Sequence, residues 1–83
     1  MNPKADWVFN ARGSLLYDSF KNYNAALADF TRAIELNPVG EYYYKRSNCY
    51  YRLGNSVNAR TDAVKALQNG YNIPAAYRST LQL

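Results

Sequence analysis

The chain has 83 residues, of which 48% are hydrophobic and 19% charged, and its formal net charge is +4. This length allows at most one small domain, and the composition is that of a globular rather than a disordered protein. One cysteine excludes an internal disulfide, no apolar run reaches the roughly 18 residues of a membrane span, and no signal-peptide pattern opens the chain. We therefore expect a cytoplasmic protein with no membrane association.

The residues that most enzymes and metal sites need are missing. Histidine, the commonest general base and a common zinc ligand, is absent. The sequence contains no glycine-rich phosphate loop and no nucleophile elbow, and its six carboxylates are scattered. We expect no enzyme activity, no metal and no cofactor. Cys49 is interpreted as a small buried packing residue, although the nearby Arg46 and Arg52 leave a redox role open.

The first predicted helix covers about residues 4–19. Asn2 can cap it, and Pro3 suits its first helical position. A turn at Lys21-Asn22 leads to a second helix over about residues 24–37. Asn37-Pro38 ends that helix, because proline disfavours helical geometry in the residue before it.

The second predicted helix has the clearest apolar face. Leu27, Phe30, Ala33 and Ile34 share one side at i, i+3, i+6 and i+7. Ala26 lies seven residues before Ala33, and two small residues there would let a neighbouring helix approach closely. Such a helix needs another helix against it.

The third and fourth helices are predicted over about residues 41–53 and 57–69. Gly54 fits a left-handed C-terminal cap of the third, and Gly70 ends the fourth. Asn55 or Ser56 can cap the fourth helix at its start.

The tail after Gly70 is predicted to form a fifth helix over about residues 74–83, opening with Pro74. Ile73, Tyr77 and Leu81 are spaced to cover the exposed face of the fourth helix. The tail could be a capping helix or the first helix of a further repeat cut short.

The sequence repeats itself with a period near 34 residues, which is the mark of stacked helical hairpins. Four residues recur after 33 positions and two after 34: Ala26, Asp29, Ala33 and Ile34 match Ala59, Asp62, Ala66 and Leu67, while Arg12 and Tyr17 match Arg46 and Tyr51. We interpret Asp29 and Asp62 as solvent-facing residues that pair with a cation three positions on, Arg32 or Lys65.

These patterns carry a family resemblance. Tyr23, Ala26, Phe30, Ala33 and Pro38 resemble the second helix of a tetratricopeptide repeat (TPR), and residues 43–55 resemble the first helix and turn of the next repeat. Arg12-Gly13 matches the first helix of the earlier copy. The second copy departs from the family at Ser47, Ala63 and Tyr71, where a glycine, an aromatic residue and a proline are usual.

The resemblance implies an all-α, TPR-like helical-hairpin array, a short α-solenoid of five helices. It implies a single domain over residues 1–83, with repeat one at about 6–38, repeat two at about 40–71 and a terminal capping helix at about 74–83. It also implies a non-enzymatic protein–protein interaction module that binds a peptide or a partner protein in a concave groove. The groove residues carried over from the family are Trp7, Asn10, Ser14, Tyr17, Tyr44, Lys45, Asn48, Tyr51, Arg52, Arg78 and Gln82.

Helix geometry alone places Tyr44, Asn48 and either Tyr51 or Arg52 on one stripe. Aromatic, amide and cationic groups suit an extended peptide, one that is acidic or ends in a free carboxylate. The alternative is that the tyrosines mainly pack between repeats. The family members that clamp the C-terminal carboxylate of heat-shock chaperones are matched poorly, because Asn10, Ser14 and Lys45 replace the residues those proteins use.

A second function remains open. The open helical ends could stack on further copies, giving a structural, self-associating scaffold and a homo-oligomer. Cations interleaved with aromatic residues can also stack nucleic-acid bases, but nucleic acid is not the partner we expect.

Overall fold

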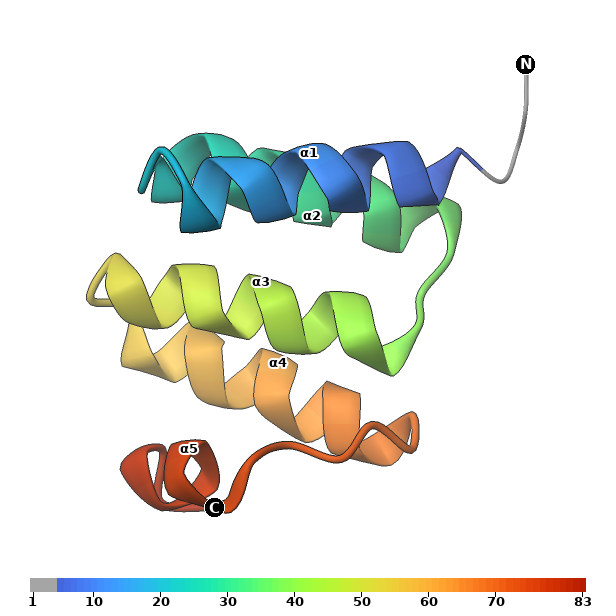
Figure 1. Cartoon of the computed structure of the whole chain (residues 1–83). Helices are drawn as coiled ribbons and strands as arrows, with labels where there is room; N and C mark the ends of the chain where they lie inside the picture. Colours follow the sequence, from blue (N-terminus) through green and yellow to red (C-terminus); the bar gives the residue numbers. More distant parts are fainter. Residues whose placement is uncertain (1–4) are drawn as a thin grey trace.

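The computed structural model describes residues 5–83, which form five α-helices and no strand (Figure 1). This arrangement confirms the predicted all-α hairpin array. The helices are α1 (Asp6–Asp18), α2 (Tyr23–Leu36), α3 (Gly40–Arg52), α4 (Ser56–Gln68) and α5 (Ala75–Thr80). The predicted cap at Asn2 and Pro3 lies outside the described residues.

The helices stack as two antiparallel hairpins and a short last layer. α1 pairs with α2, α3 pairs with α4, and α2 packs against α3 to join the hairpins. α5 lies beyond the second hairpin, on the side away from α1 (Figure 1). It is shorter than the predicted 74–83 helix: Pro74 precedes it as the N-cap, and the chain turns at Leu81 and Gln82.

Local signals set the helix ends. The side chain of Asn22 accepts a hydrogen bond from the amide of Ala25 at 3.2 Å, and Asn55 does the same for Asn58 at 3.1 Å, as expected of N-caps. Gly54 has a φ of +82°, a left-handed conformation that costs glycine nothing. Asn37 is extended before Pro38 and closes α2.

Small residues allow the two helices of each hairpin to approach closely. Ala26, Ala33 and Ala66 are fully buried, as the sequence pattern predicted. A Cβ added to Gly13 would lie 2.8 Å from the Phe30 ring, so the first hairpin depends on a glycine at that point of contact.

The interpretation of Asp29 and Asp62 as solvent-facing residues is wrong. They are only 5% and 2% exposed. Each receives two hydrogen bonds from an arginine of the preceding helix: Nε and Nη2 of Arg12 lie 2.8 and 2.7 Å from the Asp29 oxygens, and those of Arg46 lie 2.7 and 2.9 Å from the Asp62 oxygens. The two aspartates share the helix side that carries the small alanines, so they face the neighbouring helix rather than water.

The cations first assigned to those aspartates have other partners. Arg32 pairs with Glu35 at 3.2 Å, and the Lys65 ammonium lies 5.6 Å from the centre of the Tyr43 ring. The hydrogen bonds that Arg46 donates to Asp62 raise the pKa of Arg46, which keeps that guanidinium charged. The repeated Asp–Arg pair therefore fastens the two helices of each hairpin together.

A separate polar contact joins the two hairpins. Tyr42 of α3 donates a hydrogen bond to Asp6 of α1 at 2.5 Å, and Asn37 donates to the same carboxylate at 3.3 Å. Burial, followed by the contact with Asp6, raises the pKa of Tyr42 to about 12. The hydroxyl therefore stays protonated and can donate to Asp6 at neutral pH.

Candidate functional site

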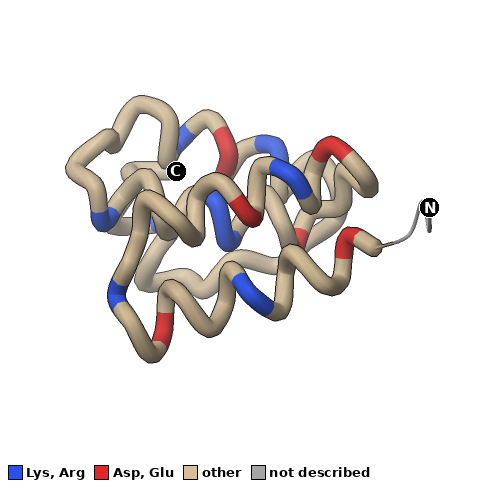
Figure 2. Tube along the Cα trace, turned by 90° about the horizontal axis from the view of Figure 1, so that it is seen from above, with Lys and Arg blue, Asp and Glu red and all other residues tan. Residues whose placement is uncertain are grey.

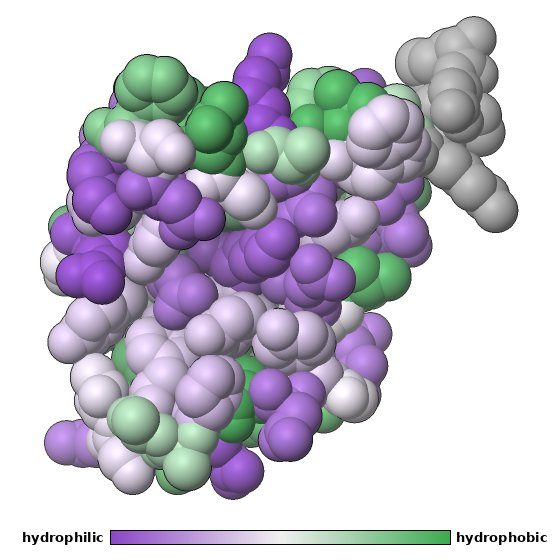
Figure 3. All heavy atoms as spheres, in the orientation of Figure 1, coloured by the Kyte–Doolittle hydropathy of each residue, from purple (hydrophilic) through white to green (hydrophobic). Residues whose placement is uncertain are grey.

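The face turned to the viewer in Figure 1 is formed by α1 and α3, which lie side by side. Figure 3 shows hydrophilic residues across the middle of this face and hydrophobic residues along its upper edge, over α1. A hollow of about 170 Å³ opens on it. Its lining comes from α1, α2 and α3 and comprises Ser14, Tyr17, Asp18, Phe30, Tyr44, Lys45 and Asn48.

Five of these seven residues belong to the groove predicted from the sequence: Ser14, Tyr17, Tyr44, Lys45 and Asn48. Asn10 does not line the hollow, but its side chain holds Lys45 in place. Phe30 and Asp18 were not among the predicted groove residues. Phe30 packs in the core as expected, with 1% of its surface exposed, and its ring also lines the hollow.

Lys45 is the central charged group of the hollow. Its ammonium donates to Asn10 at 2.9 Å and to Ser14 at 3.0 Å, and lies 3.3 Å from the carboxylate of Glu41. It also lies 6.0 Å from the centre of the Phe30 ring. With 27% of its side chain exposed, Lys45 presents a fixed positive charge whose geometry is set before any ligand arrives.

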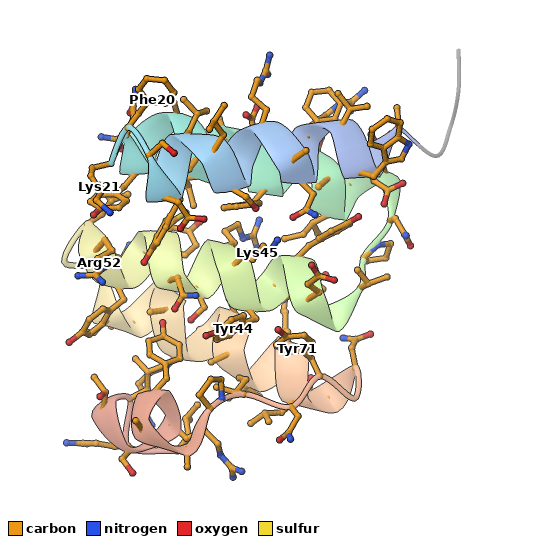
Figure 4. All side chains as sticks on the ribbon, in the orientation of Figure 1. Phe20, Lys21, Tyr44, Lys45, Arg52 and Tyr71 are labelled. Carbon is orange, nitrogen blue, oxygen red and sulfur yellow. The ribbon has the colours of Figure 1, made fainter. Side chains whose placement is uncertain are left out.

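Tyr17 connects the hollow to the turn end of the molecule. Its hydroxyl accepts a hydrogen bond from Nε of Arg52 at 3.1 Å, and its ring meets Tyr23 edge-on at 5.1 Å. The bond to Tyr17 raises the pKa of Arg52, so this cation is retained at any ordinary pH. Figure 4 places Arg52 beyond the hollow, toward the turns.

The predicted aromatic stripe of α3 packs partly against the tail. Tyr44 stacks on Tyr71 with ring centres 5.1 Å apart, and meets Tyr77 edge-on at 5.8 Å. Tyr51 meets Tyr77 at 5.9 Å. Tyr44 therefore has two roles, because it lines the hollow on one side and packs on the tail on the other. Tyr50 packs elsewhere, against the Arg46 guanidinium at 5.8 Å.

Besides Asn10, five predicted groove residues do not line the hollow: Tyr51 and Arg52, described above, and Trp7, Arg78 and Gln82. Trp7 is 62% exposed near the start of α1, and Arg78 and Gln82 are exposed in the tail. The structure therefore brings together the middle of the predicted groove, but not its two ends.

Cys49 is fully buried in the hairpin core, which confirms its interpretation as a packing residue. Burial raises the pKa of its thiol to about 12, so the reactive thiolate is disfavoured. Across residues 5–83, no three cysteine, histidine or carboxylate side chains are grouped as a metal site would require. None of the helices described here is both long enough and apolar enough to cross a membrane.

Comparison with protein families gives one match. Residues 9–39 match the model described as "Tetratricopeptide repeat". The matched segment holds most of α1, all of α2 and the link as far as Val39. No curated protein and no solved structure matches the chain.

Proposed function

We propose that this chain, a tetratricopeptide repeat protein, binds an extended peptide segment of a partner protein in the hollow between α1 and α3. Tetratricopeptide repeats are in general protein–protein interaction modules and are typically not enzymes. The observation that supports the groove is the meeting of Ser14, Tyr17, Tyr44, Lys45 and Asn48 around one hollow.

The size of the hollow favours part of a peptide over a whole small molecule. Pockets that enclose small-molecule ligands usually have volumes of about 300–1,000 Å³, whereas this hollow has about 170 Å³. A single side chain of a peptide lying across α1 and α3 fits a space of that order. The rest of the peptide would lie along the exposed surfaces of the two helices.

The chemistry of the lining favours a peptide with a carboxylate. The Asn48 amide can pair with peptide backbone, and the Tyr44 ring supplies apolar contact area. Lys45 attracts a carboxylate, which would take the place of Glu41 beside its ammonium. Because Asn10 and Ser14 already orient Lys45, little side-chain entropy is lost on binding.

The test is a selection of displayed peptides on the full chain, followed by titration of the selected peptides. Asn48→Ala should weaken binding at least about fivefold, the equivalent of roughly 1 kcal/mol, and leave the melting temperature nearly unchanged. Arg60→Ala, on the exposed outer side of α4, is the matched control and should leave the affinity unchanged. Equal affinities for the parent and the Asn48→Ala variant would remove the hollow from the binding site.

A second candidate function is self-association, favoured by the outer side of α1. Trp7, Val8 and Leu15 are 62%, 45% and 52% exposed there, and the spacing of one and two helical turns puts them on one stripe with Ala11. Sedimentation over a wide range of concentrations tests this scaffold role. A chain that stays monomeric throughout, with Leu15→Glu sedimenting identically, would exclude it.

Charge distribution favours a protein partner over nucleic acid. Lys and Arg alternate with Asp and Glu along the trace in Figure 2 rather than gathering on one side. Four of the ten lysines and arginines form salt bridges within residues 5–83. Binding that falls steeply with salt would instead indicate phosphate contacts.

The cytoplasmic location expected from the sequence is part of the same proposal and is tested by cell fractionation.

A further inference from the structure

The turn between α1 and α2 has a lysine where the corresponding turn has a glycine. Both turns end in an asparagine that caps the next helix, Asn22 in the first and Asn55 in the second. The residue before that asparagine is left-handed in each case, with φ of +53° at Lys21 and +82° at Gly54. Left-handed backbone suits glycine and strains other residues, so Lys21 occupies a position where a glycine would be more stable.

The Lys21 side chain is held at the surface. Its ammonium donates a hydrogen bond to the backbone oxygen of Asp18 at 2.9 Å, at the C-terminal end of α1, where a cation is favourable. This bond offsets part of the backbone strain. It also fixes a positive charge at the edge of the molecule, beside the turn.

The residue before the left-handed position is apolar and exposed in both turns. Phe20 is 67% exposed, which makes it the most exposed aromatic residue between positions 5 and 83. Leu53, its counterpart, is 38% exposed. One exposed apolar side chain needs no explanation, but two at equivalent places on the same end of the stack form a surface that another chain can cover.

A second cation lies at this end. Arg52 directly precedes Leu53, and its Nε is engaged by Tyr17. No hydrogen bond joins the two terminal amino groups of Arg52 to any described residue. They are therefore available to donate to both oxygens of one carboxylate. Figure 4 shows Phe20, Lys21 and Arg52 at the same end of the molecule.

We propose that the turn edge, defined as Phe20, Lys21, Arg52 and Leu53, docks an acidic segment of a partner protein in which an aspartate or glutamate lies near an apolar side chain. The two cations provide charge complementarity for the carboxylate, and the two exposed apolar residues take the neighbouring side chain. None of the four residues lines the hollow between α1 and α3. The turn edge adjoins the hollow at the Arg52–Tyr17 hydrogen bond but does not line it, and the inference does not depend on peptide binding in the hollow.

The test uses a displayed library of twelve-residue peptides selected on the full 83-residue chain. One class of the selected peptides should contain an acidic and an apolar residue, and its affinity should fall at least about fivefold in Phe20→Ser and in Lys21→Gly. Asn48→Ala in the hollow and Arg60→Ala on α4 should leave these peptides unaffected. Amide chemical shifts of residues 19–22 and 52–54 should move when a selected peptide is added.

Lys21→Gly separates recognition from stability, because it supplies the residue that the left-handed backbone favours. The variant should melt at or above the parent temperature and still lose the peptide. Phe20→Ser gives a second measurement of the affinity loss without a loss of stability, since the Phe20 side chain is exposed and belongs to no core cluster.

Three results would overturn the proposal. The first is a selection in which no peptide loses affinity in Phe20→Ser or in Lys21→Gly. The second is single-stranded oligothymidylate that shifts the same amides with a steep salt dependence, which would make the edge a nucleic-acid surface. The third is concentration-dependent dimerisation abolished by Phe20→Ser, which would make a second copy the occupant.

Discussion

The repeated Asp–Arg pair predicts unequal effects of two equivalent substitutions, Asp29→Ala and Asp62→Ala. The two pairs have the same geometry but differ in burial, because the Arg12 side chain is 63% exposed and that of Arg46 only 17%. After Asp29→Ala, the Arg12 side chain can rotate toward the solvent and be hydrated there. After Asp62→Ala, Arg46 keeps its place between the Tyr43 and Tyr50 rings, each 5.8 Å away, with Thr31 at 3.4 Å as its remaining hydrogen-bond partner.

The expected loss for Asp62→Ala is about 2–3 kcal/mol. Hydrogen bonds to charged groups contribute roughly 1.5–3 kcal/mol, and breaking a fully buried ion pair costs about 3–5 kcal/mol, so a pair with one partly exposed member falls between them. For 83 residues the total stability is on the order of 4–12 kcal/mol. The melting temperature should fall by roughly 10–20 °C, at about 4–8 °C per kcal/mol in a domain of this size. Asp29→Ala should cost clearly less.

Thermal and urea unfolding, followed by far-ultraviolet circular dichroism, measure both losses. Asp62→Asn serves as a control, because it keeps the shape of the side chain and removes its charge. Equal losses for Asp29→Ala and Asp62→Ala, or a larger loss for Asp29→Ala, would refute the argument that exposure of the arginine decides the cost.

Three further substitutions or deletions and one chemical test examine the packing. Gly13→Ala places a Cβ 2.8 Å from the Phe30 ring, which should cost roughly 1–3 kcal/mol through overpacking. This cost should exceed the gain of about 1 kcal/mol from replacing a glycine inside a helix, so the variant should be less stable. An unchanged melting temperature would contradict this contact. Ala66→Leu should lower stability by roughly 1–3 kcal/mol because Ala66 is fully buried, and a neutral result would show that the helices are not in close contact there. Deleting residues 72–83 should lower stability or cause self-association on sedimentation, because the deleted segment contains two side chains that are only 3% exposed; a stable monomer would show that the segment is dispensable. Cys49, with a pKa of about 12, should react with a thiol reagent at pH 8 only after denaturant is added, and rapid labelling of the folded chain would show that the thiol is accessible.

The fold could be predicted because its signals are local. Asn37-Pro38 stops one helix, Gly54 ends another with left-handed backbone, and the period near 34 residues requires stacked hairpins. The first two signals act over a few residues, and the third recurs at a fixed spacing along the chain. The tail was harder to predict, because six helical residues and a turn at Gln82 replace the longer helix expected there.

The Asp–Arg pairs show where reasoning from sequence failed. A partner for Asp29 was sought one helical turn away, at Arg32, whereas its partner Arg12 lies on the neighbouring helix 17 residues earlier. The information was present, because Arg12 and Arg46 recur with nearly the same period as Asp29 and Asp62. Two charges of opposite sign that recur in step within a hairpin array are better interpreted as partners across the hairpin.

The candidate site was only partly predictable for a different reason. Ser14, Tyr17 and Lys45 lie where α1 and α3 meet, and helix phase determines which residues face that boundary. Arg78 and Gln82 depend on where the last helix ends, and that helix is shorter than the sequence suggested. Phe20 and Lys21 lie in a turn and belonged to no predicted site. Their signal is the exposure of Phe20 and the left-handed φ of Lys21, and both are known only from the structure.

The departures of the second repeat from the family pattern compensate one another. In the first repeat, Gly13 leaves room for the Phe30 ring. In the second, the positions of Phe30 and Gly13 hold Ala63 and Ser47, a smaller and a larger residue. Ser47 donates to the backbone oxygen of Ala59 at 2.7 Å, and its hydroxyl lies 2.7 Å from that of Tyr77.

Through that contact the tail becomes part of the second repeat. Tyr77 also contacts the Tyr44 and Tyr51 rings, so one residue of α5 connects the centre of the second hairpin to the surface of α3. Ile73 and Leu81, each 3% exposed, cluster with the small alanines of α4, as their spacing predicted. Because Tyr44 also lines the hollow, the position of that hollow wall depends on Tyr77 being in place. The short last helix therefore supports the candidate binding face as well as covering the end of the stack.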